Sequence, residues 1–126
     1  MQQYDHSFRK LVVWQSAKKL VALVYELTKK FPHEEIFGMT SQLRRAAVSV
    51  CANLAEGNER TSNKEKIRFF VIAKSSLVEV DCLAELSLDR KYLNEKDYFQ
   101  LLEFINKTAY LICKLIKSIS QKSQYS

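Results

Sequence analysis

The polar residues of this 126-residue chain that could do chemistry together lie in one stretch, SQLRRAAVSVCANLAEGNER, from Ser41 to Arg60. At about 100° per residue, one stripe of that helix carries amide, guanidinium, hydroxyl and carboxylate groups, namely Gln42, Arg45, Ser49, Asn53 and Glu56. Such a stripe could line a catalytic or ligand pocket, but it is more often a polar network that specifies a fold. We therefore interpret it as structural, and we expect Arg45 to pair with Glu79 of the following helix.

A second group consists of the basic residues that follow this stretch, Arg60, Lys64, Lys66 and Arg68. They gather at a loop and at the start of the next helix, where free backbone N–H groups also favour phosphate. Arg44 and the pairs Lys18/Lys19 and Lys29/Lys30 could extend the patch. Contacts of this kind would be with phosphate and insensitive to sequence. For any single lysine, a solvated surface charge is the commoner interpretation.

Enzyme chemistry has the weakest support of the function classes. The chain has no glycine-rich phosphate loop and no metal-ligand spacing, although Ser, His and acidic side chains could still converge in space. Asp81, Glu85 and Asp89 recur at four-residue spacing, but hard cations need six or more converging oxygens, so we interpret them as a solvated stripe. We expect no enzyme activity, no cofactor and no bound metal.

The three cysteines, Cys51, Cys82 and Cys113, are expected to be reduced, buried packing residues. No CxxC pair, signal peptide or membrane-length apolar run is present, which favours a cytoplasmic protein without a membrane partner.

Apolar residues at spacings of three and four predict four helices, at about 8–31, 36–56, 62–92 and 94–119. Pro32 ends the first helix, and Gly57 is expected in the left-handed position just past the second. Ser62 and Asn94 are candidate caps for the third and fourth. Short connections then predict one all-α domain over residues 1–126, an antiparallel up-down-up-down four-helix bundle.

The second helix has little surface suited to water. Besides a core face (Met39, Leu43, Ala46, Ala47, Val50 and Leu54) and the polar stripe, it has an arc of mostly small residues, Arg44, Val48, Cys51, Ala52 and Ala55. A four-helix chain has no central helix, so we infer an oligomer in which this arc approaches a neighbour.

Charge is unevenly distributed along the chain, whose formal net charge is +6. Residues 79–103 hold seven acidic and three basic residues, a net charge of −4, and the remainder is +10. An uneven basic field permits nucleic-acid or anionic-surface binding.

The stretch SQLRRAAVSVCANLAEGNERTSNKEKIRFF, with the preceding FP and FGM, resembles the four-helix-bundle proteins of the 23S rRNA intervening-sequence family. The similarity covers roughly residues 8–118, including LVVWQSAKKL near the start. Cys51 stands where many members carry proline, which predicts a straighter second helix.

This resemblance implies a bundle that assembles as a ring, with a homopentamer as the expected count. It also suggests kinship with accessory proteins of diversity-generating retroelements, basic pentamers thought to bind nucleic acid and a reverse transcriptase. Together with the charge, it predicts a non-enzymatic oligomeric scaffold associated with RNA or DNA. The alternative is an adaptor for another protein that has no nucleic-acid role and uses the ring surface or the acidic segment 79–103.

Overall fold

The computed structural model describes residues 6–125 of the chain, with side chains as far as Gln121. Four long helices make up most of it: α1 (Val12–Thr28), α2 (Met39–Asn58), α3 (Asn63–Asp89) and α4 (Glu95–Tyr125). Two short 3-10 helices, η1 (Ser7–Lys10) and η2 (His33–Glu35), precede α1 and α2. The described residues contain no β-strand, and the predicted all-α class with four helices is confirmed.

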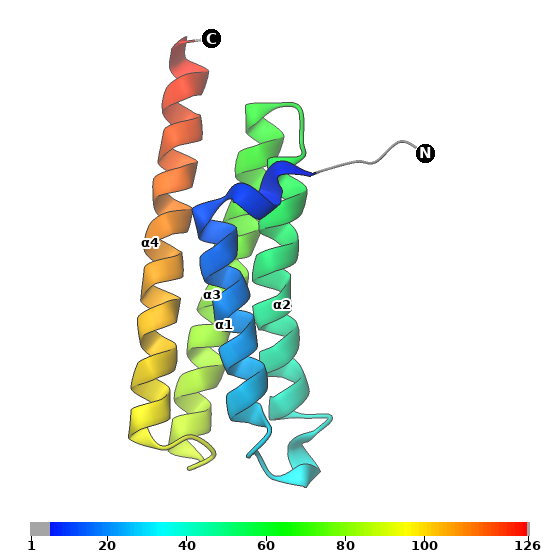
Figure 1. Cartoon of the computed structure of the whole chain (residues 1–126), viewed down its shortest axis with the longest axis vertical. Coiled ribbons are helices and arrows are strands. Elements are labelled where there is room, and N and C mark those ends of the chain that lie inside the picture. Colours follow the sequence, from blue (N-terminus) through cyan, green and yellow to red (C-terminus); the bar gives the residue numbers. More distant parts are fainter. Residues whose placement is uncertain (1–5, 126) are drawn as a thin grey trace.

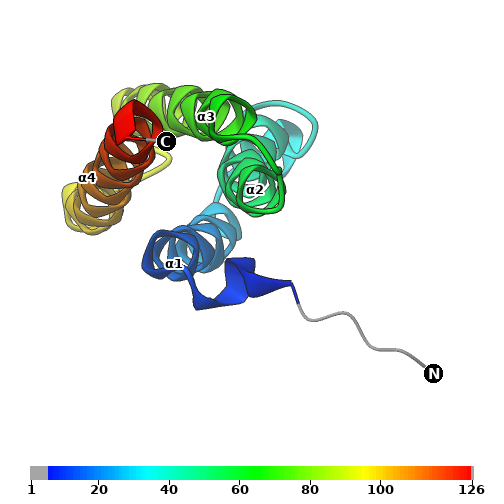
Figure 2. The same ribbon diagram turned by 90° about the horizontal axis from the view of Figure 1, so that it is seen from above.

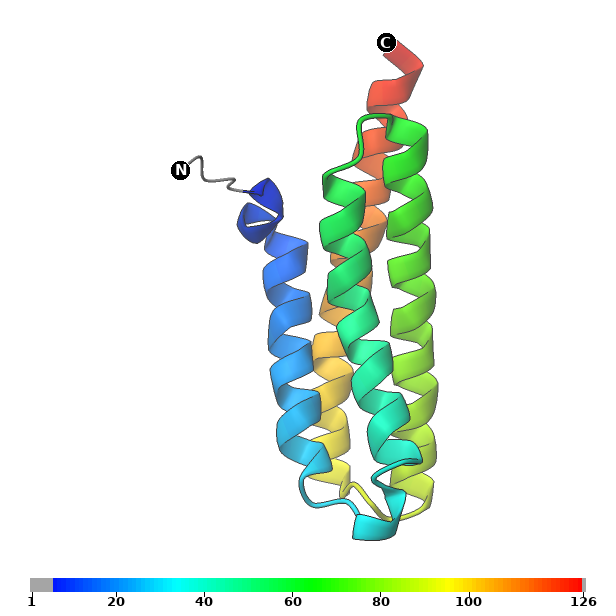
Figure 3. The same cartoon turned by 90° about the vertical axis from the view of Figure 1, so that its right-hand side faces the viewer.

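Helices that follow one another in the chain run in opposite directions (Figure 1). Viewed along the bundle, α1 lies between α2 and α4, and α3 closes the other side (Figure 2). One end of the bundle, here called the α2–α3 end, contains the start of α1, the α2–α3 turn and the last turns of α4. The other, the α3–α4 end, contains the α1–α2 and α3–α4 connections (Figure 3).

The core consists of the apolar stripes that the four helices turn towards one another. Its largest fully buried apolar side chains are Leu20, Val24, Leu43, Val50, Leu54, Phe70, Leu77, Val80, Leu101 and Ile112. Complete burial of one such side chain contributes about 1.5–3 kcal/mol relative to leaving it in water. The stripes are the main source of stability, because helices in proteins are stabilised mostly by packing of their apolar faces and less by intrinsic helix propensity.

Two pairs of hydroxyl groups mark the register of neighbouring helices, one between α1 and α4 and one between α2 and α3. Ser16 Oγ and Thr108 Oγ1 are 2.7 Å apart and buried between α1 and α4, and Ser49 Oγ lies 2.8 Å from Ser76 Oγ between α2 and α3. Each buried hydroxyl of the first pair therefore satisfies the other, which removes the cost of burying it unpaired. The pairs fix which residues of neighbouring helices lie at the same level.

The predicted caps are present, whereas the helix ends differ from the predicted ones by several residues. Ser62 Oγ accepts a hydrogen bond from the Glu65 N–H at 3.1 Å, and Asn94 Oδ1 accepts one from the Asp97 N–H at 2.7 Å. The first helix begins at Val12, not at residue 8, because Leu11 is extended (φ −70°, ψ 126°) and separates it from η1. The second begins at Met39 after η2, the third spans 63–89, and the fourth continues to Tyr125.

The predicted conformation of Gly57 is wrong. It does not lie past the end of α2 in a left-handed conformation: α2 continues to Asn58, and Gly57 has no positive φ. A Cβ at this buried position would lie 2.7 Å from Phe70 Cε1 and 2.8 Å from Phe69 Cβ. The glycine is needed because α3 passes too close for any side chain. Among the described residues the left-handed position is instead taken by Lys91 (φ 64°), between α3 and α4.

Glu35 joins the two connections at the α3–α4 end. Its Oε1 accepts a hydrogen bond from the Met39 N–H at 3.1 Å, at the start of α2, and its Oε2 accepts one from the Tyr92 hydroxyl at 2.8 Å. These two bonds, in that order, lower the pKa of the Glu35 carboxyl below its ordinary value of 4.5. The Arg90 charge lowers it further, while partial desolvation opposes the shift.

We predict that Gly57→Ala destabilises the chain, although alanine is normally the better helix former by about 1 kcal/mol. Forcing a methyl group against Phe69 and Phe70 costs about 1–3 kcal/mol, and after the gain in helix propensity is subtracted the free energy of unfolding should fall by up to about 2 kcal/mol. Chemical denaturation at one fixed chain concentration measures this. Gln100→Ala, on the exposed surface of α4, is the control and should be neutral or slightly stabilising. A more stable Gly57→Ala variant would contradict the packing described here.

We also predict that the stabilising effect of Glu35 depends on pH. Because its pKa is lower in the folded chain than in the unfolded one, the contribution is complete above about pH 4.5 and is lost as the pH falls through the depressed value. The melting temperature of Glu35→Gln should therefore lie below that of the wild type at pH 7, and the gap should narrow as the pH falls below about 4.5. Glu34→Gln, at the exposed neighbouring position, is the control for removing one carboxylate from this connection. A gap of constant size from pH 7 to pH 3.5 would refute the linkage.

Candidate nucleic-acid interface

The polar stripe of α2 is only partly a network. Asn53 Nδ2 donates to Ser49 O at 2.9 Å and to Ser49 Oγ at 3.1 Å, and Ser49 in turn meets Ser76. Glu56 lies one turn further on and forms a 4.0 Å ion pair with Arg60. The structure thus joins three hydroxyl and amide side chains at the α2–α3 contact, and it leaves the charged members of the stripe at the surface.

The expected ion pair between Arg45 and Glu79 is not formed. Both side chains are exposed, and neither makes an ion pair or hydrogen bond with another described residue. The contact line between the helices is already occupied by Ser49 and Ser76, and one turn further along both charged groups extend into water. Gln42 is likewise exposed, and its side chain has no hydrogen-bonding partner among the described residues.

The basic residues Arg60, Lys64, Lys66 and Arg68, here called the loop cluster, come together around the α2–α3 turn. Most of its charge is already engaged, since Lys66 Nζ donates to Asn58 O at 2.7 Å and Arg68 lies 3.5 Å from Glu65. The Arg60 guanidinium sits 4.4 Å from the centre of the Phe69 ring in addition to pairing with Glu56. Lys64 is exposed and has no such partner among the described residues. Residues 56–68 contain these four basic residues and three acidic ones, Glu56, Glu59 and Glu65, so the charge of the cluster is nearly balanced.

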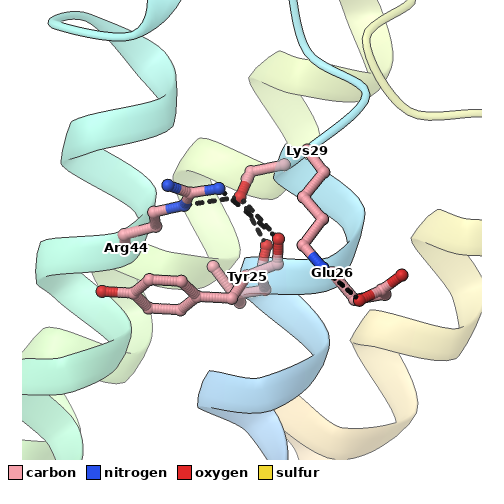
Figure 4. A network of polar contacts seen from close by, with 6 residues as sticks. Tyr25, Glu26, Lys29 and Arg44 are labelled. Atoms are coloured by element: carbon pink, nitrogen blue, oxygen red, sulfur yellow. Dashed lines mark hydrogen bonds and ion pairs between the residues drawn. The ribbon is translucent and has the colours of Figure 1, made fainter.

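Arg44 does not belong to that cluster. It precedes Arg60 by 16 residues, about 24 Å along α2. Its Nε donates to Thr28 Oγ1 at 2.8 Å, and its guanidinium stacks 4.6 Å from the centre of the Tyr25 ring (Figure 4). Thr28 Oγ1 in turn donates to Val24 O at 2.7 Å. Arg44 therefore ties α2 to the last turns of α1, and its role in this structure is to hold two helices together.

The antiparallel arrangement sorts charge along the bundle. The half nearer the α2–α3 end (residues 6–19, 51–76 and 107–121) contains twelve basic and three acidic residues, a formal charge of +9. The other half (residues 20–50 and 77–106) contains seven basic and ten acidic residues, a formal charge of −3. The acidic segment 79–103 thus lies at the α3–α4 end, away from most of the lysines (Figure 1).

α1 and α4 share a surface that lacks acidic residues. Residues 6–25 and 104–121 contain no Asp or Glu, and the Ser16–Thr108 contact places them at the same end of adjacent helices. Their seven basic side chains are all exposed and form no ion pair with a described carboxylate: Arg9, Lys10, Lys18, Lys19, Lys107, Lys114 and Lys117. We call these seven residues the α1/α4 basic surface.

The sequence predicted only Lys18 and Lys19 of this surface, as a possible extension of the loop cluster. The signal in the sequence that marks the whole surface is the lack of any acidic residue in two long segments, 6–25 and 104–121. These segments are far apart in the chain, and only the fold brings them to the same end of the bundle.

The opposite end is electronegative. Burial first, and then the negative charges of Glu85, Asp81 and Asp89, raise the pKa of Tyr98. Within residues 6–121, no group of three or more His, Cys, Asp or Glu side chains is arranged to hold a metal ion.

The cysteines differ from the expected buried set. Cys82 and Cys113 are exposed, and only Cys51 is partly buried. Burial raises the pKa of the Cys51 thiol to about 11, against an opposing effect of the Lys18 charge, so this thiol is protonated near pH 7. None of the helices in the described part of the chain is long and apolar enough to cross a membrane.

Comparison with known proteins supports the fold and gives the family. Among solved structures, a protein of unknown function from the S23 ribosomal protein family of Bacteroides thetaiotaomicron VPI-5482 superposes with a TM-score of 0.76. The match covers 84% of this chain and 99% of that one at 21% sequence identity, which shows a shared fold. None of the curated proteins compared with the chain matches it. The family model described as 23S rRNA-intervening sequence protein matches residues 9–114, and the chain therefore belongs to that family.

Proposed function

We propose that this protein is a non-enzymatic, ring-forming oligomer, with five copies as the expected number, that binds RNA or DNA through phosphate contacts at its α2–α3 end. The observation that supports this proposal is the sorting of charge into a half of +9 and a half of −3. A field of this kind attracts a polyanion to one end of the bundle and repels it from the other.

The α1/α4 basic surface suits phosphate better than the loop cluster does. Its cations have no carboxylate to give up, whereas Arg60 and Arg68 must exchange Glu56 and Glu65 for phosphate. Six of its seven members are lysines, whose flexible stems deliver point charges without a fixed geometry. Contacts of this type position a protein on the backbone and carry no base sequence.

The outer surfaces of α2 and α3 suit a second copy of the chain. They expose Val48, Val71, Ile72, Val78 and Leu86, and the neighbouring connection exposes Ile36 and Phe37, the latter at 94%. Arg45 and Glu79 lie on the same surfaces with opposite charges, and neither has an ion-pair partner among the described residues of its own chain. Subunit contacts through this α2/α3 face would leave the α1/α4 basic surface open, and a ring would present it several times to one polyanion.

Free exposed thiols at Cys82 and Cys113 suit a reducing compartment, which supports a cytoplasmic location for such a scaffold.

We predict that neutralising the α1/α4 basic surface weakens binding to nucleic acid. The triple variant Lys18→Gln/Lys107→Gln/Lys114→Gln should bind random-sequence RNA and DNA more weakly than the wild type. The plot of the logarithm of the binding constant against the logarithm of the salt concentration has a negative slope. The magnitude of that slope should decrease by roughly 2–3, because each lost phosphate contact removes about 0.7–0.9. Fluorescence anisotropy between 50 and 200 mM salt measures both quantities.

The control removes the same charge from the other half, as Lys29→Gln/Lys91→Gln/Lys96→Gln, and should keep most of the affinity. Equal losses in the two triple variants would show that net charge matters and the surface does not. No binding by the wild type at 50 mM salt would overturn the nucleic-acid proposal and favour the adaptor without a nucleic-acid role.

We also predict that Phe37 anchors the subunit contact. Native mass spectrometry of the wild type should give an oligomer, with five copies as the expected mass. Phe37→Ser should shift the distribution towards monomer, since a buried interface aromatic contributes about 2 kcal/mol or more, roughly 30-fold in each contact. Phe99→Ser, which removes an equally large exposed ring from α4, should leave the mass unchanged. A monomeric wild type, or dissociation by Phe99→Ser alone, would contradict the proposed face.

A further inference from the structure

We propose that Tyr110 is a stacking platform for an unpaired base, so that the α1/α4 basic surface prefers single-stranded over double-stranded nucleic acid. This inference rests on the proposed function, and it adds the class of nucleic acid and the residue that selects it.

Tyr110 is a large aromatic side chain in an unusual position. It lies on α4 with 65% of its surface exposed, and it makes no ring contact, ion pair or side-chain hydrogen bond with another described residue. It borders a shallow groove of about 550 Å³ that is lined by Tyr110, Cys113, Lys114, Lys117, Ser118 and Gln121. The groove contains two cations and no carboxylate.

The other aromatic rings of the basic half are already covered. Phe8 packs edge-on against Trp14 at 5.0 Å, Lys18 lies over the Trp14 ring, and Arg60 lies over Phe69. Phe70 is buried in the core. Within residues 6–19, 51–76 and 107–121, Tyr110 is therefore the aromatic ring whose face is open to a ligand.

The spacing of the lysines around Tyr110 matches what one nucleotide presents. Lys107 precedes the tyrosine by three residues and Lys114 follows it by four, so both lie about one helical turn away, roughly 4.5 and 6 Å along the axis. A base stacked on the ring would place its two flanking phosphates within reach of the two ammonium groups. Cationic grooves with interspersed aromatic rings bind single strands in this way.

The interior of a duplex cannot use the ring. Away from the two ends its bases are stacked on one another and paired, so no base face is free there unless a nucleotide is flipped out at a cost of a few kcal/mol. A duplex would contact the lysines alone. The same surface should therefore hold both forms by charge and distinguish them by Tyr110.

The chain contains a matched control on the same helix. Phe99 is similarly exposed, at 59%, but it lies in the acidic half with Glu95 and Glu103 four residues away on either side. Substitution of Phe99 removes an exposed ring of the same kind from a place where a phosphate chain is repelled.

The experiment compares Tyr110→Ala, Tyr110→Phe and Phe99→Ala in the full-length protein. Fluorescence anisotropy at 100 mM salt measures binding to random-sequence 12-nucleotide single-stranded RNA, single-stranded DNA and a DNA duplex of the same length. Tyr110→Ala should weaken single-strand binding roughly 5- to 100-fold, the effect of losing one stacked base, with RNA and DNA affected alike because stacking does not use the 2′-hydroxyl. The affinity for the duplex should change less than about twofold, and the salt dependence of binding should stay the same, since the phosphate contacts remain. Tyr110→Phe and Phe99→Ala should bind like the wild type.

Four results would overturn the inference while leaving the proposed function intact. The first is unchanged single-strand binding by Tyr110→Ala, and the second is an equal loss for duplex and single strand. The third is a loss confined to RNA or to DNA. The fourth is a change of oligomer mass in Tyr110→Ala, which would place the ring in a subunit contact. A wild type that binds none of the three probes would instead overturn the proposed function together with the inference.

Discussion

The absence of a side chain at residue 57 is the constraint on which the basic end of the bundle depends. A Cβ there would lie within 3 Å of both Phe69 and Phe70, so α2 and α3 approach as closely as they do only with glycine. This contact brings the last turn of α2 against the first turns of α3. As a consequence Arg60 lies over Phe69, and the Lys66 ammonium reaches the carbonyl of Asn58. The same close turn that gathers these cations also gathers the carboxylates that balance them.

The second constraint is the register of the helices, that is, which residues of neighbouring helices lie side by side. In the sequence, the acid-free segments at the start of α1 and at the end of α4 are separated by nearly the whole chain. The buried contact between Ser16 and Thr108 places them side by side, and the contact between Ser49 and Ser76 aligns α2 with α3. With four antiparallel helices, every charged segment is thereby assigned to one of two ends. An uneven distribution along the chain becomes a separation of charge in space.

Much of the fold could be predicted from the sequence, because burial at spacings of three and four is a local property. The stripe Phe70, Ala73, Leu77, Val80, Ala84 and Ser87 is buried throughout, and Ser62 and Asn94 cap the helices that follow them. Gly57 misled because glycine serves two purposes, a left-handed backbone or a close approach, and the sequence does not say which. Lys91 adopts the left-handed conformation, although lysine is not a residue type that indicates it.

The candidate site was less predictable because it depends on where side chains meet between helices. The Arg45–Glu79 pair required a rotation of both helices that the periodicity does not specify, and Arg44 found its partners on α1 instead of in a basic patch. The two outer cysteines follow the apolar pattern of their helices and still lie at its exposed edge. In each case the residue type was compatible with more than one position around the helix.

A polyanion meets first the surface whose charge acts over the longest distance. This depends on whether the basic residues of that surface have carboxylates close by. An exposed ion pair such as Arg68–Glu65 is worth at most about 1 kcal/mol, so phosphate could displace the carboxylate at little cost. The displaced carboxylate nevertheless remains nearby, and over a distance of about 8–10 Å in physiological salt its charge still cancels that of the arginine. The loop cluster therefore contributes little to the long-range field, whatever its local geometry. The α1/α4 basic surface has no carboxylate to cancel it, so its full charge acts on an approaching strand. Attraction is strongest where basic residues are numerous and acidic residues are absent, and in this bundle that place is the outer surface of α1 and α4.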